Sequence, residues 1–148
     1  MILSEFILLG IGGKELSEEN AAQTAKALNI IQPDFIRVHA TGIKLESKLG
    51  EFVRDGSFTL QSEEEIVIEQ KLFLQQLHEM DSYYVNEHIV NLLLEVRGNL
   101  RTEKQEMLST IDRFLTLPPD ERLLFTVGRR LNIFFRLDDL KKPKLHQK

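Results

Sequence analysis

The sequence feature that most constrains this chain is an apolar run that breaks into glycines. The run covers residues 1–9 with only two polar side chains, and Gly10, Gly12 and Gly13 follow at once. A nearly continuous apolar run of this length is typical of a strand buried on both faces. Glycines directly after it let the backbone, without side chains, come close to a neighbouring group. The sequence therefore predicts a backbone-lined turn at the end of a buried strand.

The segment after the glycines is predicted to form a helix and then a second strand. Ser17 is suited to cap a helix over residues 17–31, and Pro33 prevents the helix from continuing. Residues 35–39 alternate apolar and polar side chains, which is typical of a strand. Strand, turn, helix and strand make a βαβ unit, which predicts parallel strands joined by a right-handed crossover.

The rest of the chain is mostly helical in pattern. Helices are expected over residues 45–55, from Ser62 to about residue 80, from Thr102, and after Pro118-Pro119, with one short strand over residues 82–85. The two last helices should form a hairpin with Leu124, Val127 and Leu131 in the inward stripe of the second. The predicted fold class is α/β and helix-rich with about three strands. Its predicted divisions are residues 1–100, a hairpin over 101–140 and a frayed basic tail over 141–148.

Composition excludes several classes of function. The 148 residues include 19 Lys and Arg against 23 Asp and Glu, a net charge of -4, so the chain lacks the positive field that gathers nucleic acid or anionic membranes. No apolar run approaches the length of a spanning helix, and we expect a cytoplasmic protein. Cysteine is absent, which rules out disulfides, thiolate zinc sites and iron–sulfur clusters ligated by this chain.

Three groups of residues are candidates for chemistry. The glycines offer backbone amides beside a helix start, where an anionic or adenosyl group could bind, but Gly10-x-Gly12-Gly13 lacks the full GxGxxG pattern and also suits a purely structural turn. Arg37 and His39 share one side of their strand and could hold a carboxylate or a purine, or be satisfied by each other or by a buried acid.

Glu69 falls inside the apolar stripe of the helix that follows Ser62, so it needs a partner and would be a reasonable one for Arg37 or His39. His88, flanked by Asn86 and Asn91, is either part of a site or a loop anchor. The histidines lack metal-ligand spacing, and Arg129-Arg130 is expected to be solvated or ion-paired.

With these residues in view, the chain resembles the C-terminal part of a radical S-adenosylmethionine enzyme of the Fe–S oxidoreductase group. The resemblance covers nearly the whole chain. Residues 8–21 are similar to the fifth barrel strand of that family and the helix after it, and residues 33–38 to the sixth strand. Further similarity lies in Leu49, Gly56-x-Phe58, the helix that carries Glu69, and the stretch from His88 to Leu100.

This resemblance implies a partial (β/α) barrel. It implies that Gly10, Gly12 and Gly13 approach the adenosine part of S-adenosylmethionine, with Arg37 and His39 as further cofactor contacts, although His39 stands where relatives often have arginine. The Pro-Gly-Thr-Pro-Leu turn of relatives is replaced by residues 45–49.

The CxxxCxxC loop that holds the 4Fe–4S cluster in that family has no counterpart in this cysteine-free chain. The chain is therefore expected to be a fragment of a longer enzyme, or a split or decayed version, that contributes part of the adenosine site and the substrate wall. It is not expected to be catalytic alone. Its partners would be the N-terminal half of the barrel and a second copy, paired through open sheet edges. The alternative is a non-catalytic helical interaction module with a structural glycine turn.

Overall fold

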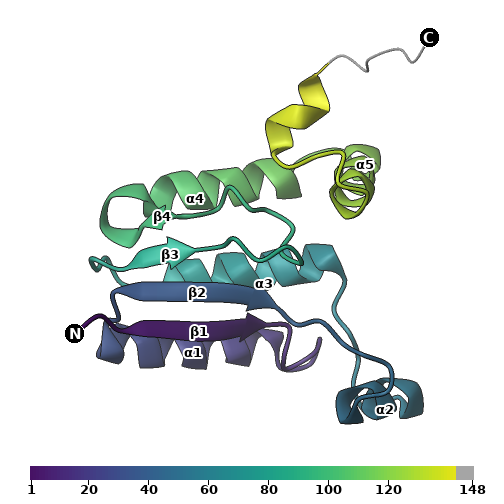
Figure 1. The fold of residues 1–148 in the computed structure, drawn as a ribbon, viewed down its shortest axis with the longest axis horizontal. Coiled ribbons are helices and arrows are strands. Elements are labelled where there is room, and N and C mark those ends of the chain that lie inside the picture. Colours follow the sequence, from purple (N-terminus) through teal and green to yellow (C-terminus); the bar gives the residue numbers. More distant parts are fainter. Residues whose placement is uncertain (143–148) are drawn as a thin grey trace.

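The computed structural model describes residues 1–142 and shows one sheet with helices packed against it (Figure 1). The elements in chain order are β1 (Ser4–Leu9), α1 (Ser17–Ile31), β2 (Phe35–Ala40), α2 (Lys48–Asp55), α3 (Glu63–Gln76), β3 (Tyr83–Val85), β4 (Gly98–Asn99), α4 (Leu100–Leu115), α5 (Pro119–Arg130) and a 3₁₀ helix η1 (Leu137–Lys141). The sheet order is β1-β2-β3-β4; the first three strands are parallel and β4 is antiparallel to β3. The predicted α/β class and parallel βαβ unit are confirmed, and the sheet is open.

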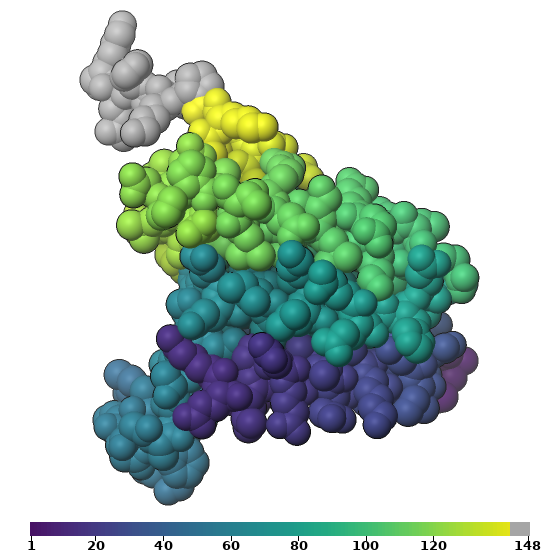
Figure 2. Space-filling view, turned by 180° about the vertical axis from the view of Figure 1, so that it is seen from behind, coloured from purple at the N-terminus to yellow at the C-terminus, as the bar shows by residue number. Residues whose placement is uncertain are grey.

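One face of the sheet carries the hydrophobic core. Ile7, Ile36 and Val38 point from the strands toward the helices, where they meet the small side chains of Ala21 and Ala25 on α1. These alanines are 1% exposed, and their size lets α1 lie close on the strands. Figure 2 shows α1, α3 and α4 side by side over this face, with α2 projecting from the body.

The opposite face of the sheet is uncovered. Phe6 and Leu8 on β1 are 67% and 47% exposed, although their neighbours Ile7 and Leu9 are buried. The prediction that β1 is buried on both faces was wrong. Within residues 1–142, helices cover only one face of the sheet. Parallel sheets are normally covered on both faces, so this exposure is unusual.

Several helix boundaries depend on polar contacts that differ from the predicted ones. The capping box of Ser62 and Glu65 at the start of α3 is confirmed. Ser17 is the first residue of α1 but does not cap it, since its hydroxyl donates to Glu69. α3 ends at Gln76, before the predicted residue 80. α4 begins earlier than predicted, because the side chain of Asn99 accepts from Arg101 N and makes the cap.

The C-terminal helices are present but differ from the predicted stripe. On α5 the predicted inward residues Leu124, Val127 and Leu131 are 46%, 46% and 63% exposed. The buried residues of α5 are Phe125, Gly128 and Arg129. Figure 1 shows α5 crossing the end of α4, where the rings of Phe114 and Phe125 lie 6.0 Å apart.

The last part of the predicted tail, residues 143–148, lies outside the described residues. Across residues 1–142, every helix is either too short or too polar to pass through a lipid bilayer.

Candidate functional site

The glycine turn stands where the sequence placed it, at the carboxyl end of β1. Gly10 and Gly13 have φ angles of 82° and 65°, the left-handed region that favours glycine. Gly13 N donates to Gly10 O at 3.1 Å, which closes the turn. Lys14 N donates to Thr59 O at 3.0 Å and ties the turn to the segment before α3. One backbone bond therefore closes the turn, and a second holds it against a distant segment of the chain.

The buried carboxylate of Glu69 holds this turn by hydrogen bonds. Glu69 is fully buried, and its Oε1 accepts from Gly10 N at 3.2 Å and from Asn20 Nδ2 at 2.6 Å. Its Oε2 accepts from the Ser17 hydroxyl at 3.1 Å and from Gln61 Nε2 at 2.8 Å. Glu69 thus joins β1, α1 and α3, and the expectation that it pairs with Arg37 or His39 was wrong.

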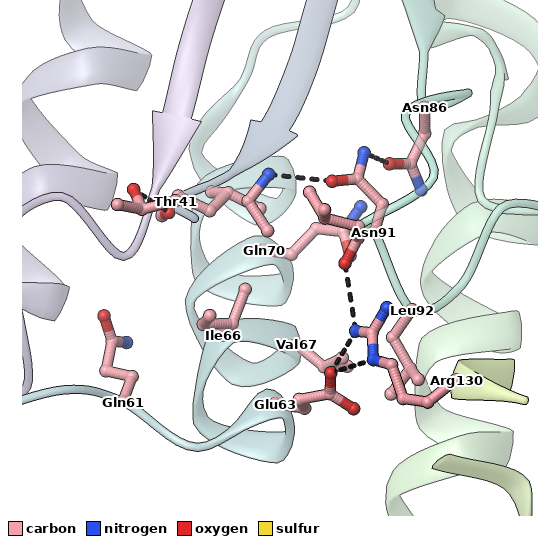
Figure 3. A pocket seen from close by; sticks show the side chains of 13 residues that line it. Thr41, Gln61, Glu63, Ile66, Val67, Gln70, Asn86, Asn91, Leu92 and Arg130 are labelled. Atoms are coloured by element: carbon pink, nitrogen blue, oxygen red, sulfur yellow. Dashed lines mark hydrogen bonds and ion pairs between the residues drawn. The ribbon is translucent and has the colours of Figure 1, made fainter. Parts of the chain in front are cut away.

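A cavity of about 370 Å³ opens beside the turn, at the carboxyl ends of β1 and β2 (Figure 3). Leu9 and Ala40 close it from the strands, and Ile66 and Val67 close it from α3. A Cβ placed on Gly10 would lie 3.4 Å from Ile66 Cδ1. Gly10 therefore packs against residues that line the cavity, although the glycine itself is not one of them.

Two polar atoms in the cavity wall lack a partner. Gln61 Oε1 and Glu63 Oε2 are buried atoms with no hydrogen-bond donor among the described residues. The other carboxylate oxygen of Glu63 is ion-paired with Arg130, which also donates to Val90 O at 3.0 Å. Both orphan atoms are acceptors on residues that line the cavity, so they are the groups of this wall that a hydrogen-bond donor would satisfy.

The far wall of the cavity is set by a pair of buried amides. Asn91 Oδ1 accepts from Ala40 N at 2.7 Å, and its Nδ2 donates to Val38 O at 2.7 Å. The same amide reaches Asn86 Oδ1 at 2.5 Å, and Asn86 donates to Leu93 O at 2.6 Å. The side chain of Asn91 thus pairs with the backbone at the end of β2, and Asn86 pairs with Asn91 and Leu93. The two amides therefore anchor the loop after β3 to β2.

Arg129 is a further anchor, and the expectation that it is solvated or paired with a surface acid was wrong. The side chain is buried, its Nε donates to Leu92 O at 3.0 Å, and its terminal nitrogen donates to Asn91 O at 2.9 Å. Burial, and secondly the charge of Arg130, lower the pKa of Arg129. For Arg130 the predicted ion pair is present, with Glu63.

Arg37 and His39 lie on the uncovered face of the sheet, opposite to the cavity. The Arg37 guanidinium stands 5.6 Å from the ring centre of Phe35 and 6.0 Å from that of Phe6. His39 meets Phe6 edge-on at 5.6 Å and stacks on His88 at 4.3 Å. The five predicted cofactor residues are thus divided between two places.

None of the three glycines is a lining residue of the cavity, and Gly12 lies against Leu16. A Cβ there would lie 2.8 Å from Leu16 Cβ, so this glycine allows the turn to approach α1.

No protein-family model matches this chain, and comparison with curated proteins and with solved structures gives no significant match.

Sequence reasoning missed Gln61, Glu63 and Gln70 as cavity residues. Each is an ordinary polar residue near or within a helix, and no local pattern marks it. They face the cavity only because α3 passes under the ends of β1 and β2. The capping box at Ser62 marks where α3 starts, but not which part of the sheet that start lies against.

Proposed function

We propose that the cavity beside the glycine turn binds the adenosyl part of S-adenosylmethionine. The observation that carries this proposal is the pair of unpartnered buried acceptors, Gln61 Oε1 and Glu63 Oε2, on residues that line a mostly apolar cavity next to Gly10. An adenine amino group, ribose hydroxyls or the ammonium of the amino-acid part would supply the missing donors. The cavity volume of about 370 Å³ lies within the ordinary range for small-molecule sites.

We further propose that the chain is one part of a larger radical S-adenosylmethionine enzyme. Its residues do not fit a 4Fe–4S cluster, since it has no cysteine, so the cluster would be held by another segment or partner. In such an enzyme the bound cofactor and cluster together supply radical chemistry. The present residues would bind and orient the adenosyl group and form part of the substrate wall, and the chain alone would not be catalytic.

The uncovered sheet face supports this larger assembly. The sheet has three parallel strands, and aromatic side chains are exposed on one of its faces. In a (β/α) barrel the corresponding face points to the interior, which further strands enclose. The missing part of a (β/α) barrel would cover that face. Because β1 is an edge strand, a second copy could also pair there. A cytoplasmic location belongs to the same proposal.

A second candidate function is supported by the exposed stripe of α5. Leu123, Leu124, Val127 and Leu131 are large apolar side chains on or just after one short helix, and each is at least 46% exposed. Such a stripe suits a helix that docks onto another protein. In this alternative the chain is a non-catalytic interaction module, and the glycine turn is purely structural.

Calorimetric titration with S-adenosylmethionine and S-adenosylhomocysteine tests the first function. Ala40→Leu would extend a side chain into the cavity, and Ala27→Leu makes the same change on the exposed face of α1. We expect the original chain and Ala27→Leu to bind both compounds and Ala40→Leu to bind at least about tenfold more weakly. Absence of binding, or equal binding by both variants, would contradict an adenosyl site in this cavity.

A further inference from the structure

A second group of polar side chains lies on the uncovered face of the sheet, separated from the cavity by the sheet itself. In the strand register Arg37 is paired with Phe6, and His39 is paired with Leu8. His88 comes from the loop after β3, and its ring stacks on that of His39 with an interplanar angle of 21°. Arg37, His39 and His88 therefore converge from two segments of the chain, and we call these three residues the basic patch.

The basic patch has no counter-ion among residues 1–142. Among residues 1–142, none of its three side chains donates to a protein acceptor or forms an ion pair with a carboxylate; the nearby Glu87 is paired with Arg97. The other residues on this face of the three parallel strands are Ser4, Phe6 and Leu8 on β1, Phe35 on β2, and Tyr83 and Val85 on β3, which include no acid. Positive groups held together without an acceptor disfavour one another.

The titration of His39 agrees with this geometry. Burial, followed by the nearness of His88 and of Arg37, lowers the pKa of His39. A bound anion would offset the repulsion from the two neighbours and favour the protonated imidazole. Binding of an anion and protonation of His39 are therefore expected to strengthen each other.

Apolar groups next to the patch indicate the rest of the ligand. Phe6 and Leu8 are 67% and 47% exposed, and Phe6 lies beside both Arg37 and His39. The two rings near Arg37 hold its guanidinium by cation–π contact and leave its fork of N–H donors available. Such a fork matches the paired oxygens of a carboxylate or a phosphate.

We propose that the basic patch binds the anionic group, a carboxylate or a phosphate, of a small organic molecule whose apolar part lies over Phe6 and Leu8. The site is distinct from the adenosyl cavity, because the sheet stands between them. If the chain belongs to a larger barrel, this molecule is the substrate, and that assignment rests on the proposed function. Anion binding itself does not require it.

Benzoate and inorganic phosphate are suitable probes, followed by the NMR signals of the histidine side chains. The test variants are Arg37→Gln and His88→Gln, with Arg101→Gln and His78→Gln as matched controls away from the patch. We expect saturable shifts at His39 and His88, affinity at least about tenfold weaker in the two test variants, and unchanged affinity in the controls. The pKa of His39 should rise when the anion binds.

Tighter binding of benzoate would identify a carboxylate ligand, and tighter binding of phosphate would identify a phosphorylated ligand. Either result supports the proposal. The proposal is overturned if neither probe gives saturable shifts up to about 50 mM, or if test and control variants bind equally. Arg37→Lys keeps the charge without the fork and should lie between the original chain and Arg37→Gln. Because these measurements do not involve the cavity, they can succeed when the adenosyl titration fails, and the reverse.

Discussion

At the scale of single residues, Glu69 determines the geometry of the glycine turn. Its buried carboxylate accepts four hydrogen bonds, from Gly10, Ser17, Asn20 and Gln61. All four donors point at the two oxygens, so the arrangement depends on four acceptor positions at residue 69. The carboxylate is therefore a positioning group for the candidate site and does not face the cavity as a free acid.

We predict that Glu69→Gln destabilises the fold. The amide keeps the shape of the side chain, but its NH₂ group faces two donors, and those hydrogen bonds are lost. The expected loss in the free energy of unfolding is about 2–4 kcal/mol, measured by urea denaturation. Glu106→Gln on the exposed side of α4 should change it by less than about 0.5 kcal/mol. Similar stability of the two variants would contradict the network described for Glu69.

His39 gives a prediction on pH. Its pKa is lowered in the folded chain, so the unfolded chain binds a proton more readily and stability is lost as pH falls below the ordinary histidine pKa of 6.5. In His39→Gln the free energies of unfolding at about pH 5.5 and about pH 7.5 should therefore differ less than in the original chain. His78→Gln serves as the control and should keep the original difference. An unchanged difference in His39→Gln would count against the lowered pKa.

At the scale of elements, Arg129 connects α5 to the loop that closes the cavity. Its guanidinium donates to the carbonyls of Asn91 and Leu92. Because Asn91 in turn binds the end of β2, α5 is linked through this loop to the sheet edge. The C-terminal helix thus supports the far wall of the cavity.

Arg129→Met is predicted to destabilise the chain by about 2–4 kcal/mol, because two buried carbonyl groups lose their donors. Arg113→Gln removes an exposed ion pair with Asp138 and should cost less than about 1 kcal/mol. Chemical denaturation compares the two, and amide hydrogen exchange should show faster exchange in residues 86–96 of Arg129→Met alone. Equal stability of the two variants would mean that Arg129 does not anchor the loop.

The same elements show what the sequence could and could not predict. The glycine turn, the parallel βαβ unit and the capping box of α3 follow from local residue chemistry, and the structure has them. The stripe of α5 does not, because the buried row of this helix has only one large apolar residue, Phe125, whereas the row of Leu124 and Val127 is exposed. The buried row contains Gly128, which packs against the ring of Phe134, and the charged Arg129. Only tertiary partners distant in sequence decide between those rows.

At the scale of the whole molecule, the candidate site was predictable only in part. The sequence located Gly10 at a strand end, and the structure adds a cavity beside it. It could not show that Arg37 and His39 lie on the other side of the sheet from that cavity. Alternation along a strand tells which residues share a face, but not which face the helices cover. The sequence also could not show that His88 lies beside His39. The loop that carries His88 is brought there by the pairing of β3 with β2.

The uncovered face and the free edge at β1 lead to the last prediction, that the isolated chain associates with itself. Exposed Phe6 and Leu8 beside an unpaired strand edge form the kind of surface that pairs with another copy, and lysine on such a strand prevents pairing. Sedimentation velocity should therefore show a dimer that grows with concentration above about 10 μM in the original chain, and a monomer in the double variant Phe6→Lys, Leu8→Lys. Ile30→Lys replaces an apolar residue that is 78% exposed on α1 and should leave the dimer intact. If the original chain is monomeric throughout this range, the edge is not an interface between copies.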